Sequence, residues 1–196
     1  MATRLATVVA LAMCLLVCGC ILSPRDPDGP PDGGATNWET PITTLIVLQN
    51  LAAAMDRESS SNYRDCFTED YRFHVDPQDS LDAGQEAEQM FADWTRADEE
   101  YATSRIFVDA AEISVAFTTV LQPDETQPET CRQVDYTLAV TWQSGPHVNE
   151  EIIYRGRASL WMRRSDSGRW AIFRWVDRRM GGTNRTWGAL RGDYRG

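Results

Sequence analysis

The spacing of apolar residues along the chain changes near residue 105. Before this point apolar side chains recur every three to four positions, which is typical of helices that bury one face. We predict one helix that opens at Thr40-Pro41, a second over 63–68 and a third that begins at Asp82. The residues expected on the buried faces of the first and third helices are Ile42, Leu45, Ile46, Leu48, Ala52 and Met55, and Ala87, Met90, Phe91, Trp94 and Tyr101.

After residue 105 apolar and polar residues alternate, and turn residues separate the runs. This pattern predicts four long strands at 113–121, 134–142, 152–163 and 170–177, after a short strand at 71–75. Trp170 and Ile172 are expected in the core. Helices followed by an antiparallel meander predict an α+β domain over residues 38–179, with its N-terminal helices packed on the sheet.

Residues 1–19 have the form of a signal peptide, with one early charge at Arg4 and an apolar run from 5 to 17. The run ends in the sequence LVCGC (16–20), which resembles a bacterial lipobox. The resemblance implies cleavage before Cys20 and attachment of lipid to that cysteine. An ordinary secretory signal, cleaved at another position, is the alternative.

Residues 20–37 are rich in proline, glycine and aspartate and show no apolar period, so we expect a solvated tether. Together with a lipid on Cys20, this tether predicts a bacterial cell-envelope protein that contacts the membrane through its anchor. Ile21 follows the cysteine where inner-membrane lipoproteins of Gram-negative bacteria carry aspartate. The outer membrane is therefore the favoured location in such a cell.

Three stretches carry a family resemblance: 63–73 (YRDCFTEDYRF), the end of the predicted sheet at 156–177, and 186–190 (TWGAL). In this order they resemble the nuclear transport factor 2-like superfamily, also described as SnoaL-like or as a cystatin-like cone. The resemblance covers about residues 38–190. It implies a curved antiparallel sheet whose concave face holds the helices around a conical cavity. The superfamily contains both enzymes and non-catalytic binding domains, so the fold alone does not assign a function.

Strand alternation predicts which side chains face the cone. The expected cavity residues are Trp94, Tyr101, Tyr136, Leu138, Trp142, Tyr154 and Leu160. This mostly apolar set favours a small apolar ligand, or a scaffold role, over acid–base catalysis. The enzymatic alternative is a cyclase, isomerase or dehydratase in which His74 acts as general base beside Asp76. The short strand leaves open which face His74 occupies.

The sequence offers no cofactor or metal motif. Its two histidines are 73 residues apart, and it contains no phosphate-binding loop. The acidic run at 98–100 is expected on a solvated helix face. Cys66 and Cys131 remain after signal cleavage, and the sequence leaves open whether they form a disulfide. A formal charge of −10 without a basic tail argues against nucleic-acid binding.

Charge is divided unevenly along the chain. Residues 151–196 carry eleven arginines and four acidic residues, whereas 20–150 carry seven arginines and twenty-five acidic residues. We predict an interface for a second copy or another protein on the outer face of the sheet, at Arg155, Arg157, Trp161 and Arg163. The alternative is that cross-strand carboxylates neutralise these arginines.

The tail at 180–196 contains paired glycines and then Thr186, which can cap a single helical turn. Trp187 and Leu190 would share one side of this turn. Because an isolated turn is unstable in water, the Trp187 ring would have to be buried against the domain. The alternative is a disordered end that carries Arg185, Arg191 and Arg195.

Overall fold

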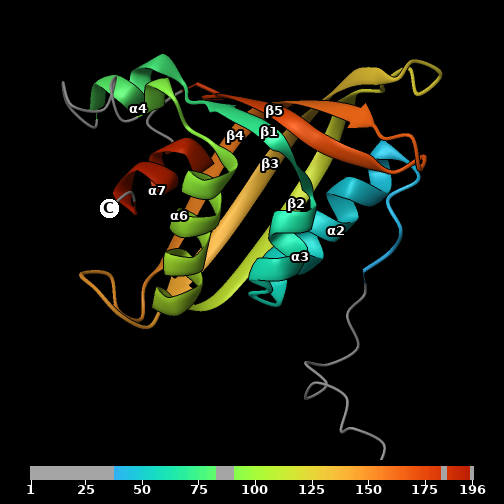
Figure 1. Cartoon of the computed structure of the whole chain (residues 1–196). Helices are drawn as coiled ribbons and strands as arrows, with labels where there is room; N and C mark the ends of the chain where they lie inside the picture. Colours follow the sequence, from blue (N-terminus) through green and yellow to red (C-terminus); the bar gives the residue numbers. More distant parts are fainter. Residues whose placement is uncertain (1–37, 83–90, 182–184, 195–196) are drawn as a thin grey trace, which may run out of the picture. The chain divides into compact units, whose positions relative to one another are not determined.

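A five-stranded sheet forms the centre of the computed structural model, which describes residues 38–82, 91–181 and 185–194 (Figure 1). The predictions for the signal peptide, Cys20, the tether, Ala87, Met90 and Arg195 lie outside these residues. The strands, in chain order, are β1 (Phe67–His74), β2 (Ala110–Leu121), β3 (Glu129–Trp142), β4 (Glu151–Arg164) and β5 (Trp170–Arg178). Their order in the sheet is β1-β5-β4-β3-β2.

All neighbouring strands are antiparallel except β1 and β5, which run parallel. The predicted α+β class is confirmed. The short strand expected at 71–75 is longer than the sequence indicated, and it joins the sheet at the edge beside β5.

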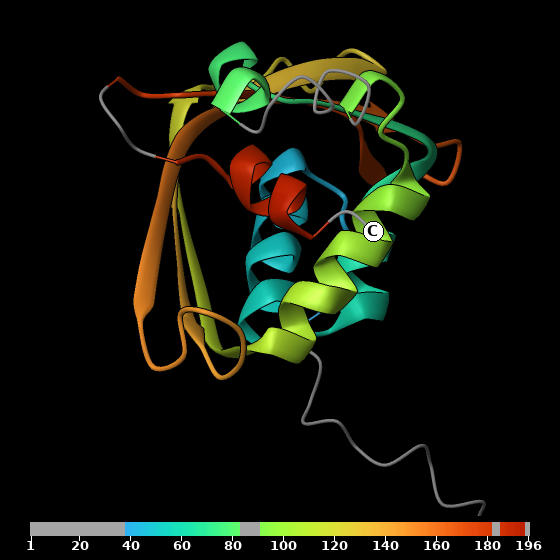
Figure 2. The same ribbon diagram turned by 90° about the vertical axis from the view of Figure 1, so that its left-hand side faces the viewer.

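The helices are α2 (Thr44–Asp56), α3 (Ser60–Asp65), α4 (Pro77–Asp82), α6 (Arg96–Asp109) and α7 (Trp187–Asp193). Figure 2 shows α2, α6 and α7 on the same side of the sheet. In β3 every second residue is buried and the alternate residues are partly exposed, because the helices cover only one face. The described helices leave the other face of β3, β4 and β5 uncovered. We call it the outer face.

Two helix predictions need correction. The first helix begins after Thr43, whose side chain accepts a hydrogen bond from the Ile46 amide, and not at Thr40. Ile42 is 62% exposed and Leu45 is also exposed, whereas the face with Val47 and its neighbours is buried. Both faces of this segment are apolar, so the tertiary contacts decide which one is buried.

Asp82 does not start the third helix but is the last described residue of α4, and residues 83–90 of the predicted helix lie outside the described residues. Instead α6 begins after Thr95, which forms a capping box with Asp98. Trp170 and Ile172 are buried as expected. In the described part of the chain, no helix is both long and apolar enough to cross a membrane.

Candidate functional site

The C-terminal helix α7 lies in the space between α6 and the sheet, where the resemblance implied a cavity (Figure 2). Thr186 caps this helix and accepts a hydrogen bond from the Ala189 amide. Trp187, Leu190 and Arg191 are fully buried. The Trp187 ring lies 5.0 Å from the Trp175 ring, centroid to centroid. Among the described residues, side chains of the domain's own tail therefore occupy this space.

A buried ion pair joins α7 to α6. Arg191 Nε donates to Glu99 Oε1 at 2.9 Å, and both side chains have no exposed surface. Tyr63 OH also donates to Oε1, at 2.5 Å. The second carboxylate oxygen accepts from Trp94 Nε1 at 2.9 Å, and Tyr71 OH lies 3.5 Å from it. Among the described residues, the close donors to the carboxylate other than Arg191 therefore come from outside α7.

Aromatic rings surround the Arg191 guanidinium. Its Cζ atom lies 4.3 Å from the ring centroids of Phe73 and Trp175, and 5.1 Å from that of Trp187. A cation over aromatic faces is stabilised by the ring quadrupole, most strongly when water is excluded. Burial is the largest single influence on the pKa of Arg191 and lowers it, but the charge and hydrogen bond of Glu99, together with Tyr63 and Tyr71, raise this pKa overall, so the guanidinium stays charged.

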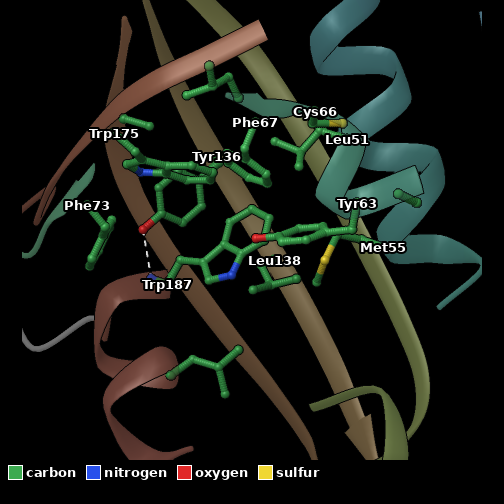
Figure 3. Packing of buried hydrophobic residues seen from close by; sticks show 14 of the residues in the cluster. Leu51, Met55, Tyr63, Cys66, Phe67, Phe73, Tyr136, Leu138, Trp175 and Trp187 are labelled. Carbon is green, nitrogen blue, oxygen red and sulfur yellow. Dashed lines mark hydrogen bonds between the residues drawn. The ribbon is translucent and has the colours of Figure 1, made fainter. Parts of the chain in front are cut away.

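A second buried carboxylate, Asp177 at the end of β5, holds the first turn of α7. It accepts hydrogen bonds from Tyr136 OH at 2.9 Å and from the Gly188 amide at 2.9 Å. Tyr136 OH in turn accepts from the Trp187 amide at 2.8 Å, as the dashed line in Figure 3 shows. Burial raises the pKa of Asp177 to about 6.

A third carboxylate ties α4 to the same helix. Asp79 is buried and accepts from the Thr186 hydroxyl at 2.5 Å. Its other oxygen accepts from Arg179 Nε at 2.8 Å, just after β5. Asp79, Asp177 and Glu99 thus each bind the α7 segment.

Six of the seven residues predicted to line the cavity are buried, and they pack in the core: Trp94, Tyr136, Leu138, Trp142, Tyr154 and Leu160. Tyr101 is 49% exposed and lies at the surface, so its prediction is corrected. The reason is the later start of α6, whose buried side carries Glu99, Ala102 and Ile106. Three surface clefts of about 450, 340 and 420 Å³ are lined mainly by other residues, although Tyr101 borders the third.

His74 lies on the outer face of the sheet, because Tyr71 and Phe73 take the buried positions of β1. Partial burial and the nearby Arg174 and Arg178 lower the pKa of His74. Asp76 instead accepts from the Gln78 and Arg179 amides, at 2.8 and 3.0 Å. Within the described residues His74 and Asp76 are not bonded to each other, so the structure does not bring the proposed catalytic pair together.

The residues of the predicted interface lie together on β4, on the outer face. Arg157 forms a bidentate pair with Asp135 at 2.7 and 3.1 Å. Arg163 forms an ion pair with Asp70 through Nη1 and another with Glu129 through Nε. Neutralisation by carboxylates on other strands, which was the alternative to the predicted interface, therefore applies to both arginines. Trp161 between them is 38% exposed.

Cys66 and Cys131 are both free thiols, so they form no disulfide. Cys66 is buried, and burial raises the pKa of its thiol. In the described part of the chain, no group of three or more His, Cys, Asp or Glu side chains is arranged to hold a metal ion.

The sequence interpretation missed the ion pair of the interior. Glu99 was expected on a solvated face with its acidic neighbours, yet it is fully buried. One signal was available: Glu99 stands three, four and seven positions before Ala102, Thr103 and Ile106, which share the buried side of α6. Its partner Arg191 is 92 residues away, and no local pattern links the two.

Comparison with known proteins gives similarity in structure only. No family model matches the chain, and no curated protein sequence matches it. A protein of Novosphingobium aromaticivorans assigned as an aromatic ring hydroxylase matches with a TM-score of 0.55 and 15% identity, over 74% of this chain and 91% of its own. A conserved protein of Planctomyces limnophilus matches with a TM-score of 0.54 and 18% identity, over 66% and 88%.

A second Novosphingobium aromaticivorans protein, assigned as a scytalone dehydratase, matches with a TM-score of 0.53 and 12% identity, over 72% of this chain and 89% of its own. Identities this low establish the fold and not the activity. The chain has the nuclear transport factor 2-like α+β fold, a class that includes small-molecule binding proteins and enzymes.

Proposed function

We propose that this protein is a non-catalytic domain of the bacterial cell envelope, anchored through a lipid on Cys20, that acts as an interaction scaffold. Its partner, a second copy of the chain, docks on the outer face of the sheet. The sequence LVCGC at 16–20 and the tether at 20–37 support the anchor.

The observation that carries the proposal is the occupied interior. A ligand site in such a fold needs a concave space with a few convergent polar groups. Here Glu99, Asp177 and Tyr136, the groups suited to proton transfer, are each bonded to α7. An apolar ligand in the cone would first have to displace Trp187 and Leu190. A scaffold role requires no such displacement.

The outer face supplies the docking surface. Trp161 is exposed, and its cross-strand neighbours are Cys131 on β3 and Arg174 on β5. Tryptophan and arginine are enriched at protein interfaces, where the ring supplies much of the binding energy. The Arg157–Asp135 pair places both signs of charge beside it. A surface with both signs can complement a second copy of itself across a two-fold axis.

Photo-crosslinking in the cell envelope tests the proposal. We would replace Trp161 in the full-length protein with p-benzoylphenylalanine and irradiate intact cells. We expect a crosslinked species with twice the mass of the mature chain. The matched control carries the same amino acid at Val108, which is 69% exposed near the end of α6 and away from the outer face.

The outcomes of this experiment distinguish a second copy of the chain from another partner, and both from the absence of a docking surface. A crosslinked product of another mass, found with Trp161 replaced but not with Val108 replaced, would retain the scaffold and replace its partner. The absence of any specific product at Trp161 would overturn the docking surface. Crosslinking of equal yield at both positions would indicate random collision and would also overturn it.

A further inference from the structure

The Glu99 carboxylate is held in position by residues that do not belong to α7. Tyr63 comes from α3, Tyr71 from β1 and Trp94 from the segment before α6. Tyr63 OH and Trp94 Nε1 bond different oxygens of the carboxylate, at 2.5 and 2.9 Å. The orientation of this buried anion is thus fixed without the arginine, which makes Glu99 a preorganised acceptor.

Two aromatic faces complete the surroundings of the carboxylate. Phe73 on β1 and Trp175 on β5 have ring centroids 6.4 Å apart, and both lie 4.3 Å from Arg191 Cζ. A planar guanidinium is recognised by a carboxylate together with aromatic faces, on which it stacks. The described residues outside α7 therefore provide both elements of a guanidinium site.

Arg191 makes only some of the hydrogen bonds that a guanidinium can form with a carboxylate. Its Nε and Nη2 atoms both approach the same oxygen, Glu99 Oε1, at 2.9 and 2.7 Å. The usual fork, in which two nitrogens meet two oxygens, is not formed. Nη1 is buried and has no acceptor among the described residues. An unpaired buried donor is unfavourable, so a ligand that seats its guanidinium differently can compete with Arg191.

We propose that Glu99, Phe73 and Trp175 form a guanidinium-binding site, which Arg191 occupies as an intramolecular ligand and which an external guanidinium can enter when α7, with its buried Trp187 and Leu190, moves out. The ligand is a small guanidino compound or the arginine side chain of another peptide segment. The site lies on the helix-covered side of the sheet, so it is independent of the docking surface around Trp161.

Chemical rescue tests whether a small guanidino compound binds the site. In the full-length Arg191→Ala variant, ethylguanidinium replaces the atoms that the substitution removes. We expect it to raise the melting temperature in proportion to the logarithm of its concentration. At ten times its dissociation constant it would raise the folded-to-unfolded ratio about elevenfold. Ethylurea, which is neutral and similar in shape, is the control compound. The Glu99→Gln/Arg191→Ala double variant is the control protein.

Peptide exchange tests whether the arginine of a peptide segment binds the site. It does not require the Arg191→Ala variant to fold. A protease site is inserted after Gly181, which is exposed, and the folded full-length chain is then cut there. A fluorescent peptide of residues 185–196 should exchange into the cut protein. The control peptide carries citrulline in place of Arg191 and so lacks only the charge. We expect it to bind at least tenfold more weakly.

Selectivity for the charged group decides the proposal. If only ethylguanidinium binds more tightly than its neutral analogue, the ligand is a small guanidino compound. If only the arginine peptide binds more tightly than the citrulline peptide, the ligand is an arginine-bearing segment. If neither arm distinguishes the guanidinium from its neutral analogue, α7 is held by its apolar residues and the proposed site does not exist.

Discussion

Replacing Glu99 with glutamine should destabilise the domain strongly. The substitution removes the negative charge that compensates the Arg191 guanidinium, and neither group is exposed. The new amide group also conflicts with its surroundings, because its NH2 must face either Arg191 or Trp94 Nε1, which are both donors. Breaking one partner of a buried ion pair costs about 3–5 kcal/mol.

For a domain of this size, each kcal/mol lowers the melting temperature by roughly 2–4 °C, so the expected decrease is about 6–20 °C. Thermal unfolding followed by circular dichroism measures it. Glu100→Gln is the matched control, because this neighbouring carboxylate is 39% exposed and pairs only with Arg96 in the described structure. A pair of that kind contributes about 0.3–0.5 kcal/mol.

A double-mutant cycle with Arg191→Met isolates the pair. The double variant should lose less stability than the sum of the two single variants, with a coupling energy of about 2 kcal/mol or more. Two results would refute the buried ion pair as the link between α6 and α7. One is that the stability losses of the two single variants simply add in the double variant; the other is that the Glu99→Gln variant melts within about 2 °C of the parent.

The other predictions concern the anchor, a titrating carboxylate and the packing of the sheet. Cys20→Ser should release the protein into the soluble envelope fraction; unchanged membrane association on cell fractionation would contradict lipidation. Asp177 has its pKa raised to about 6 in the folded protein, so the stability that it contributes is present at acidic pH and is lost as the pH rises through 6. Relative to Asp177→Asn, the parent should lose about 3 kcal/mol between about pH 4 and pH 7 in urea unfolding, and parallel profiles would disprove this. Gly156→Ala should cost roughly 1–3 kcal/mol, since the new Cβ would lie 2.5 Å from Tyr136 Oη; an unchanged urea midpoint would show that the ring moves away freely. Trp170→Ala should cost roughly 3–5 kcal/mol in the same assay, because the ring is almost completely buried, and a small loss would show that the core refills the space.

The strands could be predicted because their signal is local. In β3 each buried side chain is followed by a partly exposed one, and the sequence records this alternation from Val134 to Trp142. Likewise, Thr186 before a tryptophan and a leucine at helical spacing indicated a short turn, which α7 forms. Patterns of this kind depend on neighbours within a few positions, so a single sequence reveals them.

The interior network could not be predicted in the same way. Glu99 and Arg191 each stand in a polar stretch, and only the tertiary fold brings them together. The face of His74 depends on which side of β1 the helices cover, and this short strand gives no independent signal for it. Charge and hydropathy describe the tendency of a residue type to be exposed or buried, whereas the burial of a particular side chain depends on partners far away in the chain.

The parallel pairing of β1 with β5 has a consequence for how the polypeptide folds. Phe67 lies opposite Ile172, so about a hundred residues must be synthesised after β1 before its partner strand exists. Contacts of such long sequence separation slow folding, because the loop must close before the pairing stabilises it. During this interval Tyr71 and Phe73 belong to an unpaired strand whose apolar side chains are open to other chains. We therefore expect aggregation of the nascent or refolding protein to begin at β1, and binding of a chaperone to that strand to suppress it.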